Sequence, residues 1–61
     1  MWTTIYLAVN KAQANSVAET LKSAGFLVKV EEDLEENLYE ILVLQYEAED
    51  AQDLLLERGI I

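Results

Sequence analysis

The stretch YEILVLQY, residues 39–46, decides the fold because four consecutive apolar residues occupy its centre. Neighbouring side chains of a β-strand point to opposite faces of the sheet. The apolar run at positions 41–44 therefore predicts a central strand that is covered on both faces. The chain has only 61 residues, so it has little material with which to cover the second face.

The size and composition of the chain limit how it can be stabilised. A domain of this length buries only about 60% of the surface of its unfolded chain, so its own core is marginal. The sequence has no Cys and no His, which excludes disulfides and removes the commonest ligands of transition metals. We expect no cofactor and no metal site, and oligomerisation is the remaining way to bury more surface.

The net charge of −8 indicates which partners the chain avoids. Twelve acidic residues against four basic ones repel nucleic acids and anionic membranes, whereas they favour a basic protein. The apolar N-terminal segment lacks the basic region of a signal peptide, and no apolar run approaches the roughly 18 residues of a membrane span. We therefore expect a soluble cytoplasmic protein that binds neither nucleic acid nor membrane.

Hydrophobic periodicity divides the chain into strands and helices. Alternation and β-branched or aromatic residues predict strands, and an apolar stripe of period 3.6 predicts helices. The predicted strands span residues 2–9, 26–31 and 38–45, and the predicted helices span residues 11–24 and 47–58. Asn10 is a suitable N-cap with Gln13 completing a capping box, and Gly25 and Gly59 suit the left-handed positions that end the two helices.

This order of elements predicts a single α+β domain over residues 1–61, with a β-α-β-β-α ferredoxin-like fold. A right-handed crossover places the first helix on one face, and the acidic segment joins the second and third strands as an antiparallel pair. The most apolar strand is central, so the three-stranded antiparallel sheet has the order 1-3-2 with both helices on one face. The side chains expected under the helices are Ile5, Leu7, Val9, Val28, Val30, Ile41 and Val43.

The face of the predicted sheet without helices is unusually apolar. A small sheet tolerates some exposed apolar side chains, and the alternative is that this face mediates self-association. We favour a homo-oligomer, most simply a dimer. The predicted self-association face consists of Trp2, Tyr6, Leu27, Leu42 and Leu44.

An acidic run begins at the end of the second predicted strand and continues through the predicted loop to the third. Its spacing lacks the alternating ligands and the glycine of a calcium loop, so a cation site is not expected. The run either docks a basic partner protein or is a solvated hairpin loop. Its members are Glu31, Glu32, Asp33, Glu35 and Glu36.

Signs of catalysis are weak. Without His or Cys, no nucleophile–base pair is recognisable, and a chain this short has little room for a deep pocket. Asn10 and Lys11 open the first helix, where an anion could bind, but no glycine allows a phosphate to approach closely. We therefore expect no enzyme, and helix capping is the stronger interpretation of Asn10.

The segments MWTTIYLAVNKAQANSVAETLKSAGFLVKV (residues 1–30) and YEILVLQYEAEDAQDLL (residues 39–55) resemble a group of short proteins from Firmicutes. That group resembles the prokaryotic signal-transducing family whose fold is similar to the nitrogen-regulatory PII proteins. This sequence departs from the pattern at Leu44 and Tyr46, where relatives often have Pro and Ser.

The resemblance implies a ferredoxin-like fold and a regulatory role, but no ligand, because the effector motif of the PII proteins is missing. Some relatives carry a glutamate decarboxylase label, which is not expected to apply because a pyridoxal-phosphate enzyme needs a far larger scaffold. Two functions stay open: a regulatory or protein-interaction module that acts as a homo-oligomer, and a small-ligand sensor with a site at the subunit interface near Asn10 and Lys11.

Overall fold

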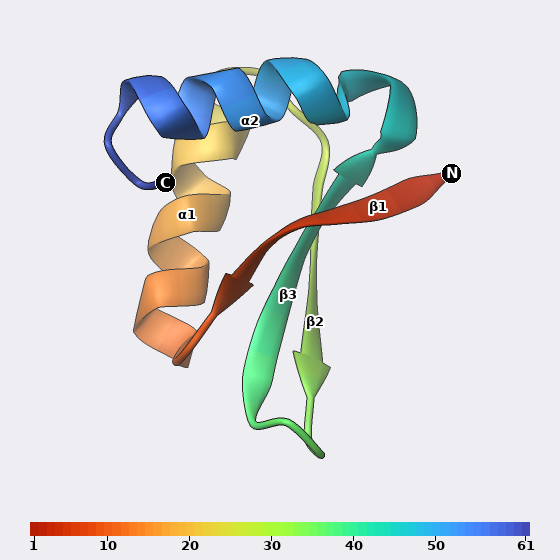
Figure 1. Cartoon of the computed structure of the whole chain (residues 1–61), viewed down its shortest axis with the longest axis vertical. Helices are drawn as coiled ribbons and strands as arrows, with labels where there is room; N and C mark the ends of the chain where they lie inside the picture. Colours follow the sequence, from red (N-terminus) through yellow and green to blue (C-terminus); the bar gives the residue numbers. More distant parts are fainter.

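The computed structural model describes all 61 residues and contains the predicted order of elements (Figure 1). Its elements are β1 (Trp2–Ala8), α1 (Lys11–Ser23), β2 (Val28–Asp33), β3 (Leu38–Leu44), the 3-10 helix η1 (Gln45–Glu47) and α2 (Ala48–Glu57). Strand β3 lies between β1 and β2 and is antiparallel to both. The α+β prediction with sheet order 1-3-2 is confirmed. Neither helix is long and apolar enough to cross a lipid bilayer.

The hydrophobic core lies between one face of the sheet and the two helices. Alanines on both helices allow the helix backbones to approach the sheet closely, and the largest fully buried side chains fill the space between them. Leu21 and Leu55 are the largest that the helices contribute, and each stabilises the fold by about 2 kcal/mol. The core residues are Ile5, Ala8, Ala14, Val17, Leu21, Ile41, Val43, Ala51 and Leu55.

The start of α1 follows the predicted capping pattern. The side-chain Oδ1 of Asn10 accepts a hydrogen bond from the N–H of Gln13 at 2.7 Å. The side chain of Gln13 reaches back and accepts from the N–H of Val9 at 2.8 Å, one residue before the cap. Two backbone N–H groups at the turn are thereby satisfied, which favours a helix start at Lys11.

Both helices end at a glycine in the left-handed region. Gly25 has φ of 96°, and the N–H of Phe26 donates to the carbonyl of Leu21 at 3.1 Å. Gly59, with φ of 75°, is followed by Ile60, whose N–H donates back into the last turn of α2. Phe26 and Ile60 also pack against the core, so each cap closes with an apolar contact.

Strand β1 contains an irregularity that the sequence did not predict. Thr4 lies opposite Leu42 and Tyr6 lies opposite Ile41, so Ile5 is an extra residue that has no partner on β3. Such a bulge places two successive side chains on the same side of a strand. Ile5 and Tyr6 therefore both face the helices, and the alternation beyond them is reversed.

Several predictions about single residues are wrong for this reason or because the strands end early. Tyr6 packs against the core instead of lying on the face without helices. Leu7, predicted under the helices, is 53% exposed on the opposite face. Val9 follows the end of β1 and is exposed. Val30 lies opposite Ile41 and therefore on the helix side as predicted, but on the edge strand β2 it stays 39% exposed.

The boundaries of β2 also differ from the prediction. The strand begins at Val28 and continues to Asp33, so it includes Glu32 and Asp33, which were predicted in the loop. Glu and Asp are disfavoured in strands, but pairing with the apolar β3 extends the ladder to the pair formed by Asp33 and Leu38. The hairpin loop is therefore short and spans residues 34–37.

Candidate interaction surface

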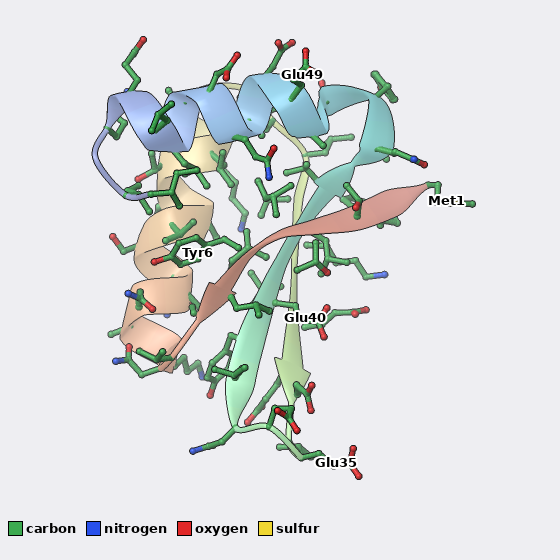
Figure 2. The ribbon with its side chains drawn as sticks, in the orientation of Figure 1. Met1, Tyr6, Glu35, Glu40 and Glu49 are labelled. Atoms are coloured by element: carbon green, nitrogen blue, oxygen red, sulfur yellow. The ribbon has the colours of Figure 1, made fainter.

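The sheet face without helices is the candidate functional surface, and we call it the open face. Residues that lie opposite one another in an antiparallel pair project to the same side, so the register assigns each side chain to a face. Figure 2 shows the two sides: Tyr6 extends toward α1, whereas Glu40 lies on the other side of the strands. The open face carries Trp2, Thr4, Leu7, Lys29, Glu31, Asp33, Leu38, Glu40, Leu42 and Leu44.

The open face has an apolar end and an acidic end. At the apolar end, Trp2 lies opposite Leu44, and Leu27 directly precedes β2 at the same level. At the acidic end, close to the hairpin loop, Glu31 lies opposite Glu40. Asp33 follows two residues later on the same face. The surface therefore changes from apolar to strongly negative along the strands.

The centre of the open face is covered by the chain's own side chains. Lys29 and Trp2 belong to the two edge strands, and the Nζ of Lys29 lies 5.6 Å from the centre of the Trp2 ring. Strand β3 lies between the two edge strands, so the contact between Lys29 and Trp2 spans β3 beside Leu42, which lies opposite Lys29. Leu42 is accordingly only 8% exposed. The aliphatic stem of a lysine and a cation–π contact thus cover the middle of this face.

Polar contacts flank this cover. The hydroxyl of Thr4 donates to Oε1 of Glu40 at 2.7 Å, and Lys29 pairs with Glu31 at 3.4 Å. Each carboxylate of the opposing Glu31 and Glu40 pair therefore has its own partner, which reduces the repulsion between two like charges at directly opposite positions.

The structure brings together only part of the predicted self-association face. Trp2 is 38% exposed and Leu27 is 62% exposed, whereas Leu44 is half-buried and Leu42 is buried in the single chain. Tyr6 is absent from the open face, and Leu7 takes a place there. The bulge that exchanges these two residues depends on pairing with β3, and no residue type in β1 signals it.

The predicted acidic loop does not form one cluster. Glu31 and Asp33 lie on the open face, whereas Glu32 lies on the helix side, 3.5 Å from the hydroxyl of Tyr39. Only Glu35 and Glu36 belong to the hairpin loop, where Figure 2 shows Glu35 at the tip.

Asp33 organises the hairpin instead of offering a free carboxylate. Its Oδ1 accepts from the backbone N–H groups of Glu35 and Glu36, both at 3.1 Å. Such bonds to nearby backbone are the usual use of Asp in a turn. Asn37 then takes a left-handed conformation with φ of 58°, which Asn tolerates better than most residues.

The predicted alternative site at the start of α1 is occupied by the helix cap. Asn10 Oδ1 accepts from Gln13, and the Asn10 carbonyl accepts from the N–H of Ala14. No pocket is found on the chain, and no group of acidic side chains is arranged to hold a metal ion. At the start of α2, Glu47 has one buried carboxylate oxygen without a hydrogen-bond partner, close to the positive end of the helix dipole.

Comparisons with protein-family models, with curated proteins and with solved structures find no match to this chain.

Proposed function

We propose that this chain is a small regulatory or protein-interaction module that acts as a homo-oligomer, most simply a dimer, and that the PII-like resemblance of its sequence reflects such a role. The observation that supports the proposal is the apolar end of the open face, where Trp2 and Leu27 are exposed beside the half-buried Leu44. Neither helix lies on this face, because both contribute to the core on the other side.

The energetics favour covering this end with protein. Removing apolar surface from water contributes about 25 cal/mol per Å², so covering a few large side chains amounts to several kcal/mol. A small domain has a total stability of about 5–15 kcal/mol, so the contribution is large on the scale of the molecule. A second copy presents the same apolar end, and a two-fold axis brings the two ends together.

The proposal also gives the acidic residues a role. The hairpin loops lie at the opposite end of the sheet from the apolar ends. A contact between the apolar ends of two copies therefore leaves the loops accessible to a basic protein partner. Electrostatic complementarity would then raise the rate and the specificity of that second interaction. We propose no catalytic activity for the chain.

Sedimentation velocity on the wild type and on a Leu27→Lys variant tests the proposal. The wild type is expected to sediment as an oligomer at micromolar concentration. Leu27→Lys places a charge in the apolar end and is expected to weaken association at least tenfold, or by about 1.4 kcal/mol. Because Leu27 precedes β2 and is 62% exposed, the variant is expected to keep the circular dichroism spectrum of the wild type.

Leu56→Lys is the matched control, since Leu56 is 64% exposed on α2, outside the open face. This variant is expected to remain an oligomer. A wild type that is monomeric up to submillimolar concentration, or equal sedimentation of the two lysine variants and the wild type, would overturn the proposal. Leu42→Lys is a poorer test because Leu42 is already buried within one chain.

A further inference from the structure

We infer that the free edge of β1, over residues 2–4, pairs with the same segment of a second copy and joins the two sheets into one. The inference rests on the proposed function in one respect, namely that the partner is a second copy. It concerns a different surface, because the apolar end of the open face is a face of the sheet and this contact is made in the plane of the sheet. The two-fold axis of the edge contact is perpendicular to the sheet, so both open faces point to the same side and the edge contact joins a different pair of copies from the face contact.

The sheet has two free edges, and they differ in charge. Strand β1 (Trp2–Ala8) contains no charged residue, in a chain whose net charge is −8. Strand β2 contains Lys29 and three acidic residues, so its edge carries the charges with which proteins protect exposed strands. Two copies of an acidic chain repel each other at β2 edges, and they meet without that repulsion at β1 edges. A basic partner would instead prefer the β2 edge.

The direction of the backbone groups identifies which residues of β1 can pair. The N–H of Gln45 donates to the carbonyl of Met1 at 2.7 Å, so Met1 and Gln45 form a hydrogen-bonded pair. Backbone groups alternate in direction along a strand, so those of Thr3 point toward β3 and those of Trp2 and Thr4 point outward. Figure 1 shows this first half of β1 extending away from α1.

The bulge limits the pairing to this half of the strand. The regular register ends after Thr4, and the extra residue Ile5 bends the edge. A symmetric antiparallel register then places Thr3 on the two-fold axis and Trp2 opposite Thr4 of the partner subunit. Each such pair exchanges two backbone hydrogen bonds, and the contact covers Met1 and Trp2, which are 89% and 38% exposed in the single chain.

Amide hydrogen exchange of the wild type, followed by NMR as the protein concentration is raised, tests the inference without any substitution. The amides of Trp2 and Thr4 are expected to become at least tenfold more protected as the oligomer forms. The outward amide of Val30 on the β2 edge is the internal control and is expected to stay unprotected, because its neighbour Lys29 is the residue paired inward with Leu42.

A pair of variants at Thr4 provides the second test. Thr4→Pro removes the outward N–H without breaking a backbone hydrogen bond to β3, and edge strands tolerate such a proline. Thr4→Val loses the hydroxyl bond to Glu40 but keeps the N–H, so it controls for that loss. In sedimentation, Thr4→Pro is expected to weaken association at least tenfold while Thr4→Val associates as the wild type does.

The outcomes separate this inference from the proposed function. If Trp2 and Thr4 stay unprotected in the oligomer, or if Thr4→Pro associates like Thr4→Val while Leu27→Lys does not, the edge contact is wrong and the proposed function stands. A monomeric wild type overturns both. If Thr4→Pro does not fold, the exchange experiment on the wild type decides.

Discussion

Lys29 is the residue whose position on the open face has the largest consequence for the single chain. It lies opposite Leu42, its Nζ lies 5.6 Å from the centre of the Trp2 ring, and it pairs with Glu31. Lys29→Ala is expected to lower the free energy of unfolding by about 1 kcal/mol, because the cover over Leu42 and the cation–π contact are both lost. Urea unfolding at one fixed protein concentration measures the change.

Lys29→Met separates the packing of the stem from the charge. Methionine keeps an unbranched apolar side chain of similar reach, so it is expected to retain more than half of the stability that Lys29→Ala loses. Glu31→Gln is expected to change little, since a half-exposed ion pair contributes about 0–1 kcal/mol. Equal stability of Lys29→Ala and the wild type would show that other side chains cover Leu42.

At the scale of elements, the sequence predicted the features that depend on neighbouring residues and missed those that depend on pairing between strands. The caps of both helices follow from residues within a few positions of each end, such as Asn10 and Gly25, and these predictions are confirmed. The bulge at Ile5 depends on the register with β3, which lies far away in the sequence. The extension of β2 through its acidic residues likewise depends on β3, because Glu and Asp on their own favour a loop.

The same division applies to the candidate surface. The apolar pattern of positions 41–44 correctly indicated a strand with two buried faces, and Trp2 and Leu44 were placed on the correct one. What covers the second face at Leu42 was not predictable, because a lysine from β2 and a tryptophan from β1 meet there only when the sheet has formed.

The cap of α1 is a local element and its contribution can be measured. Asn10→Ala is expected to destabilise the protein by about 1 kcal/mol, because the N–H of Gln13 loses its acceptor. Asn10→Asp keeps an acceptor and adds a negative charge to a first turn that has no acidic residue, so it is expected to be at least as stable as the wild type. Thermal unfolding of both variants tests this, and equal melting temperatures for Asn10→Ala and the wild type would contradict it.

For the whole molecule, the net charge of −8 distinguishes a second copy from a basic partner. Two acidic copies repel each other, and salt screens that repulsion over a Debye length of about 10 Å at 0.1 M. Self-association is therefore expected to strengthen several-fold between about 0.02 and 0.5 M NaCl, whereas binding to a basic protein would weaken. Sedimentation equilibrium across this range measures the dimer Kd directly.

The hairpin tip supplies the control for this salt dependence. Glu35 and Glu36 are exposed and make no contact with the apolar end or with β1. Neutralising both, as Glu35→Gln with Glu36→Gln, reduces the charge of each copy by two and is expected to tighten the dimer at low salt while changing it little at high salt. If the Kd instead rises with salt in the wild type, attraction between opposite charges holds the copies together, and an apolar or uncharged contact between them is the wrong description of the assembly.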